Sequence, residues 1–274
     1  MTQTSHAATS RPRQSAAQWM RYSGTAWFTI AAGSQFLFGL YVIALYGVAT
    51  LAGDLFQRAS FMPVGFKPGD AGNNIQLGLH LAAAAFLSCV GAWQLVPQVR
   101  ARVPGLHRLV GRIYLPLAVV AGVGGAILIW TRERPASLEA DISITLNGLA
   151  IALCALLAWR AAVQRRFADH QAWATRLFLM VSGVWFLRVG LMAWVAINGG
   201  EPVGIGNLDG WFYNLWNYGS WIVPLAVHEA WRAAGRATTA GPKLAMAAGM
   251  AVATALTLLG TILAVIGMWL PRLI

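Results

Sequence analysis

Residues 177–197 have the sequence LFLMVSGVWFLRVGLMAWVAI, and this stretch decides the fold class. Arg188 is its only charged residue, and almost every other residue is apolar. About 20 such residues cross the hydrocarbon core of a bilayer as one α-helix, so the stretch predicts a transmembrane span. A guanidinium stays protonated there, at a cost of about 2.5–3.5 kcal/mol on insertion scales. Arg188 is therefore a candidate functional residue.

The whole chain repeats this pattern, because 58% of its 274 residues are hydrophobic and only 11% are charged. Soluble domains carry about 25% charged residues, so we expect an all-α, polytopic transmembrane helical bundle. The stretches long enough to span are 25–50, 75–97, 113–131, 142–161, 176–197, 213–231 and 244–270. The sixth stretch is interrupted by Asn214, Asn217, Tyr218 and Pro224, so six spans are the alternative to seven. We expect spans 2–5 to form the core.

Two regions follow from this pattern: a polar cytoplasmic segment, 1–24, and a single seven-helix transmembrane domain, 25–274. If the N-terminus lies in the cytoplasm, 14 of the 20 Lys and Arg residues fall on the cytoplasmic side and five outside. The positive-inside rule then predicts an N-in, C-out topology. The net charge of +11 is spread over separate loops, which indicates contact with anionic lipid and not with nucleic acid.

Two loop motifs resemble a known family. His107-Arg108-Leu109-Val110-Gly111-Arg112-Ile113-Tyr114 is similar to a His-Arg-x-x-Gly-Arg-x-Tyr signature, and His170-Gln171-Ala172-Trp173-Ala174-Thr175-Arg176 to a His-x-x-Trp-x-x-Arg element. Both belong to the bacterial membrane-protein family called domain of unknown function 2306, and His80 and Arg188 also match family positions. The resemblance covers 75–197 and implies a multi-pass protein of the bacterial inner membrane, with no settled activity. The motif residues besides the histidines and Arg188 are Arg108, Gly111, Arg112, Tyr114, Trp173 and Arg176.

Three histidines lie near the predicted cytoplasmic ends of spans: His107, His170 and His228. Neutral imidazole is a common metal ligand and haem ligand, and helical bundles build such sites between facing helices. These residues therefore predict a redox protein that binds a b-type haem or a transition metal. The competing interpretation is that the three imidazoles only bond loop carbonyls or lipid phosphate.

A second candidate site lies in the predicted outer half. Its members are polar or charged residues in spans 2, 4, 5 and 6, namely His80, Asn147, Arg188, Asn214, Asn217 and Tyr218. A pocket among them would suit a small anion, a quinone or a lipid, as in a non-enzymatic carrier or binding protein. The alternative is a hydrogen-bond network in a structural or assembly factor.

Other classes of protein are disfavoured by the sequence. It has no Cys pair at metal-binding spacing, no nucleophile elbow, no P-loop and no dinucleotide-binding glycine motif. No Asp or Glu lies deep in a predicted span, which disfavours proton pumping through carboxylates. Gly219 and Pro224 are the predicted position for a broken helix of the kind found in transporters. Whether the protein is an enzyme, and its oligomeric state, stay open.

Overall fold

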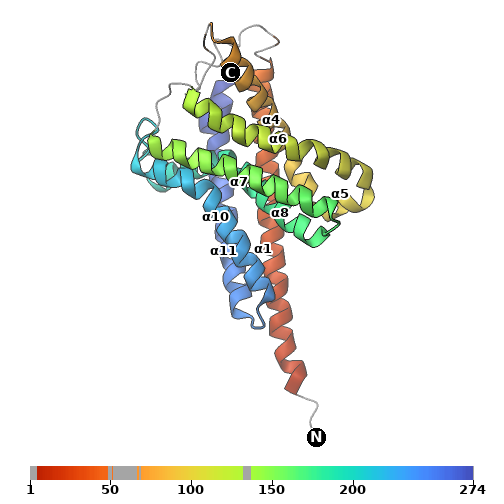
Figure 1. The fold of residues 1–274 in the computed structure, drawn as a ribbon. Helices are drawn as coiled ribbons and strands as arrows, with labels where there is room; N and C mark the ends of the chain where they lie inside the picture. The colour runs from red at the N-terminus through yellow and green to blue at the C-terminus, as the bar shows by residue number, and fades with distance from the viewer. Residues whose placement is uncertain (1–4, 49–50, 52–66, 68, 132–136, 274) are drawn as a thin grey trace.

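The computed structural model describes residues 5–48, 51, 67, 69–131 and 137–273, with side chains from residue 14 onward. Within these ranges all the regular structure is helical (Figure 1). The α-helices are α1 (Ser5–Val42), α4 (Ala71–Leu95), α5 (Pro97–Arg102), α6 (Pro104–Thr131), α7 (Leu138–Val163), α8 (Phe167–Val181), α9 (Gly183–Ile197), α10 (Trp211–Arg236) and α11 (Gly241–Ala264). Short π-helical turns, Ile43–Gly47 and Val265–Trp269, extend α1 and α11, and a 3₁₀ turn, Leu270–Arg272, follows the second.

Five helices in the described ranges are long and apolar enough to cross a membrane, and α8 with α9 makes a sixth if the bent pair is one span. The five are Gln14–Gly47, Ala71–Leu95, Pro104–Thr131, Leu138–Val163 and Gly241–Arg272. The first begins well before residue 25, and its helix already starts at Ser5, inside the segment expected to be a separate polar region. The sixth predicted span falls within α10. The polar residues of α10 make this helix less apolar than the five helices above.

The outward faces of these helices are apolar, as a lipid environment requires. On α7, Leu146, Leu149, Leu153 and Leu156 are all exposed and recur every three or four residues along one side of the helix. That spacing places them on a single face. A stripe of this kind is the signature of a helix that contacts lipid chains, so the exposed leucines support a membrane-spanning fold.

The helices form two groups (Figure 1). In one group α1 and α11 lie side by side, and α9 packs on α11. In the other group α4, α6, α7 and α8 pack successively, and α10 contacts α7, α8 and α9. At the α6–α7 crossing, Gly122 and Gly148 bring the two backbones together, because a Cβ at either position would meet the other's carbonyl oxygen. Close approach at small residues is how membrane helices gain packing energy.

The fifth predicted span is not one continuous helix, which corrects the sequence-based expectation. Helix α8 ends at Val181 and α9 begins at Gly183, with a bend of 51° between them. The hydroxyl of Ser182 donates to the Phe178 carbonyl (2.7 Å) and accepts from Gln35 Nε2 of α1 (2.8 Å). Asn147 Nδ2 of α7 donates to the Met180 carbonyl (3.2 Å). Side chains from two neighbouring helices therefore satisfy polar groups at the bend.

The predicted position for a broken helix was wrong. Helix α10 continues from Trp211 to Arg236 with Pro224 inside it, and the break lies instead at Ser182. A proline removes only one backbone donor, and a membrane helix tolerates this where neighbours compensate.

Candidate functional site

A cavity of about 960 Å³ lies where α4, α5, α6, α7 and α8 meet, and we call it the basic cavity. It brings together two of the three predicted haem ligands, His107 at the start of α6 and His170 at the start of α8. The charged residues on its lining are Arg100, Arg108 and Arg112. Its wall is otherwise mainly apolar or aromatic, including Leu115, Trp159, Phe167, Leu177 and Phe178.

The two imidazoles differ in how they are held. His170 Nδ1 lies 3.0 Å from the carbonyl oxygen of Ala158 in α7. Since a carbonyl only accepts, we assign the proton to Nδ1, which leaves Nε2 of His170 as a lone-pair donor. His107 Nδ1 is buried and has no hydrogen-bond partner among the described residues. One ring is thus fixed, and the other has an unused nitrogen.

The three guanidinium groups of the basic cavity are available to a ligand. Arg100, Arg108 and Arg112 are exposed at its rim, and none forms an ion pair with a described residue. Guanidinium groups bind carboxylates and phosphates through paired, charge-assisted hydrogen bonds. The cavity therefore combines apolar walls with positive charge at its mouth.

The remaining residues of the first motif shape this cavity. Gly111 lies beside Gln94, whose amide oxygen is 3.6 Å from where a Cβ would be. Tyr114 is buried, and its ring packs on Gly91, where a Cβ would lie 3.1 Å from the phenolic oxygen. Both residues line the cavity together with the two arginines of the motif. The first motif is thus concentrated at one site.

The second motif ties helices together. Arg176 Nε donates to Glu229 Oε1 of α10 at 2.8 Å, and its guanidinium lies 4.7 Å from the ring centre of Trp173. Arg232 also pairs with Glu229, at 3.3 Å. Together with the His170–Ala158 contact, these bonds fix α8 to both α7 and α10.

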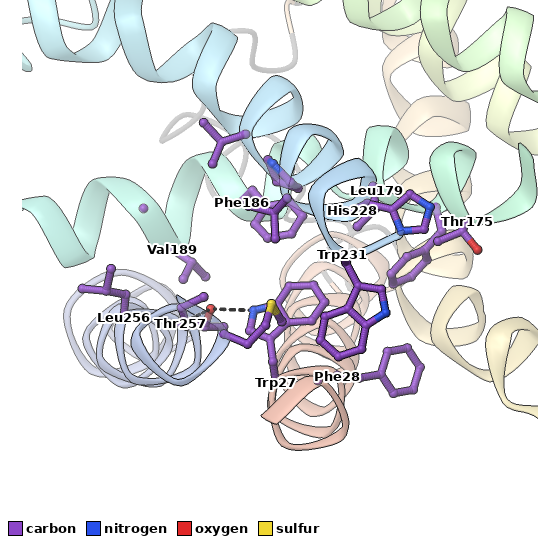
Figure 2. Close-up of a pocket in the computed structure, with 18 of the residues that line it drawn as sticks. Trp27, Phe28, Thr175, Leu179, Phe186, Val189, His228, Trp231, Leu256 and Thr257 are labelled. Atoms are coloured by element: carbon purple, nitrogen blue, oxygen red, sulfur yellow. Dashed lines mark hydrogen bonds between the residues drawn. The ribbon is translucent and has the colours of Figure 1, made fainter. Parts of the chain in front are cut away.

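His228 lies in a different place from the other two candidate ligands. It lines a second cavity of about 960 Å³, the aromatic cavity, between α1, α9, α10 and α11 (Figure 2). The two cavities share a wall made of Leu95, Pro97, Thr175 and Phe178. The structure therefore does not bring the three histidines into one site. Over the described residues, no group of three or more His, Cys, Asp or Glu side chains could hold a metal ion.

Arg188, the only charged residue of the stretch 177–197, lines neither of the two cavities. Its Nη1 donates to the Val184 carbonyl one turn earlier (3.0 Å), and its guanidinium lies 5.2 Å from the ring centre of Phe38. Tyr41, Tyr46 and Tyr213 lie within electrostatic range. A backbone carbonyl and one aromatic ring therefore contact this charge, and the ring contact is of the cation–π kind.

The other residues of the predicted outer site make contacts within their own helix or with a neighbouring one. The ring of His80 packs on Gly125 of α6, and its Nδ1 has no partner in the described part of the chain. Asn214 and Asn217 each donate to a nearby carbonyl, those of Asp209 and Tyr213 respectively. Tyr218, like these residues and Asn147, lines neither cavity. A shared ligand site among these residues therefore stays a prediction.

Long apolar helices around an interior with polar residues define an integral membrane protein. The chain belongs to the family described as "Predicted membrane protein (DUF2306)", whose model matches residues 77–232. This match extends beyond 75–197 and includes most of α10, with His228 and Glu229. The search of curated proteins and the search of solved structures found no match.

The aromatic cavity was not predicted from the sequence. Its wall contains Trp27 and Phe28 of α1, Phe186 of α9 and Trp231 of α10, which are far apart in the chain. The sequence signal is the abundance of tryptophan, 13 residues in all, but tryptophan is also typical of membrane interfaces and therefore does not indicate a cavity.

Proposed function

We propose that the protein is a redox protein of the bacterial inner membrane that binds one b-type haem in the basic cavity, where His107 and His170 would hold it. In this proposal the chain crosses the membrane seven times, N-in and C-out, with α10 as the sixth span. The basic cavity then lies near the cytoplasmic face. The observation that carries the proposal is that both histidines line one cavity of about 960 Å³.

The nitrogens of the two rings support this assignment. A haem ligand is commonly oriented by a hydrogen bond from its second ring nitrogen, often to a backbone carbonyl. The contact between His170 Nδ1 and Ala158 meets that requirement and leaves Nε2 to bind iron. His107 has a buried nitrogen without a partner in the described chain, and such groups usually indicate a missing ligand or water.

The surroundings also suit a haem. Phe167, Leu177 and Phe178 give the macrocycle apolar walls, and the volume lies near the upper end of the range for cofactor pockets. A haem carries two propionates, and Arg108 and Arg112 would neutralise them at the mouth of the cavity. His228 has no part in this site.

A second candidate function uses the same cavity for an anionic amphiphile, such as a lipid or fatty acid. The three unpaired arginines at its rim favour this candidate, because a phosphate or carboxylate would satisfy them without a cofactor. The protein would then be a carrier or binding protein with no chromophore.

The absorption spectrum of the purified protein separates the two candidates. We expect a Soret band, a reduced-minus-oxidised difference spectrum of a b-type haem, and one haem per chain by haem extraction. A colourless protein that stays colourless after haemin is added, and that carries phospholipid or fatty acid, would replace the first candidate by the second.

A further inference from the structure

The aromatic cavity is the second large cavity, and the haem proposal does not use it. Its lining extends along α10 from Phe212 to Trp231, about 28 Å at 1.5 Å per residue. That length is close to the roughly 30 Å of a bilayer's hydrocarbon core. A ligand that fills the cavity is therefore long, and nearly all of it is apolar.

The unused polar groups of this cavity lie at one end. The indole N–H groups of Trp27, Trp194 and Trp216 already donate to Thr257, Val203 and Phe186 respectively. Near the end of α10, His228 Nε2 is buried with no partner among the described residues. Arg21 and Gln98 line the same end. The ligand is therefore an amphiphile with a single polar head.

The head end is suited to a flat ring. Figure 2 shows His228 between α10 and α8, with Thr175, Trp231 and Phe28 nearby. Aromatic side chains stack on planar rings. Glu229, next to His228, pairs with both Arg176 and Arg232.

We infer that the aromatic cavity binds a quinone-class ligand, with its ring between Trp231 and Phe28, a ring carbonyl accepting a hydrogen bond from His228, and its isoprenoid tail along α9 and α10. Thr175 donates its own hydroxyl proton to the Gln171 carbonyl, so His228 is the buried donor at this position. The site is separate from the haem proposal, and either can fail without the other.

Binding of decylubiquinone to the detergent-purified full chain tests the inference, by isothermal titration calorimetry and by quinone analysis of solvent extracts. His228→Leu removes the donor, and we expect at least tenfold weaker binding. His228→Gln keeps an N–H group, so we expect it to recover part of the affinity.

A matched pair of variants tests the tail channel without relying on His228. Ala253 of α11 lines the cavity, whereas Ala251 is exposed on the same helix and does not line it. Ala253→Phe fills the channel and should weaken binding at least tenfold, and Ala251→Phe should leave it within twofold. If His228→Leu fails to fold, this pair of variants still tests whether the quinone tail lies in the cavity.

Three results would overturn the inference: no binding of decylubiquinone by the wild type, equal affinity in Ala253→Phe and Ala251→Phe, or complete displacement of the quinone by phosphatidylglycerol. A colourless wild-type protein that binds quinone would end the haem proposal and leave this one intact.

Discussion

The basic cavity and the aromatic cavity have the same volume, about 960 Å³, and share one wall, yet they differ in the polar groups they present. The basic cavity has two histidines with three arginines at its rim. The aromatic cavity has one histidine and one arginine at one end, and a long apolar channel beyond them. Volume and apolar walls therefore do not select a ligand here. The number and position of unsatisfied donors and charges do, and each prediction below tests that difference.

The largest effect on stability and ligand binding is expected from a substitution in the wall that the two cavities share. Phe178 is 4% exposed and lines both cavities, so Phe178→Ala would join them and cost about 3–5 kcal/mol of stability. We expect haem content and decylubiquinone affinity to fall together in this variant. Leu179→Ala is the control, because Leu179 lines the aromatic cavity alone and should lower only quinone binding. If Phe178→Ala lost only haem or only quinone binding, the claim that Phe178 forms a wall of both ligand sites would be contradicted.

A smaller effect is expected from the ion pair beside the two cavities. Arg176→Met removes the bond between α8 and α10, and we expect a loss of about 1 kcal/mol, or about 3 °C in Tm for a chain of this size. Arg166→Met is the matched control, because Arg166 pairs with Asp169 on the same helix and both side chains are about half exposed. Thermal unfolding in detergent compares them. Equal shifts in Tm would show that the bond between α8 and α10 adds nothing.

A substitution at the bend between α8 and α9 should lower stability less than the loss of this ion pair. Asn147→Leu removes one hydrogen bond to the Met180 carbonyl, and such bonds in membrane proteins are worth about 0.6 kcal/mol. Thr29→Ala, which removes a bond within α1, is the control and should change stability by less. A loss of more than about 2 kcal/mol from Asn147→Leu would exceed the range for one such bond and would mean that the bend depends on this residue.

The smallest effect on ligands is expected from Arg188. Its contacts are the Val184 carbonyl and the Phe38 ring, outside both cavities. With expression levels matched, Arg188→Leu should leave haem content and quinone affinity within about twofold, or about 0.4 kcal/mol. Arg188→Lys should behave likewise. A tenfold loss in the Leu variant that Lys does not restore would return Arg188 to the binding site, as its position in the sequence first suggested.

The fold class could be predicted from the sequence because length and apolar composition fix it locally. The break at Ser182 could not, because its cause is not local: Gln35 and Asn147 are distant in the chain and satisfy the polar groups of the bend. A serine–glycine pair within an apolar stretch is compatible with a straight helix. Only the neighbouring helices decide the outcome.

The sequence predicted the surroundings of some candidate site residues better than those of others, again because contacts with distant helices carry no local signal. His107 and His170 each lie in a motif beside a loop, and short connections bring those helix ends together in one cavity. His228 had the same sequence signal, yet α10 turns it toward α1 and α8. The position of Arg188 within an apolar stretch was evident from the sequence, but the Phe38 ring that it contacts comes from α1 and carries no local signal.

The haem content of three single variants tests the central claim most directly: His107→Leu, His170→Leu and His228→Leu, each purified and compared at matched protein concentration. The account predicts that the first two variants lose the Soret band and that His228→Leu keeps one haem per chain. A full haem complement in His107→Leu or His170→Leu, or its loss in His228→Leu, would contradict the assignment of the basic cavity as the haem site.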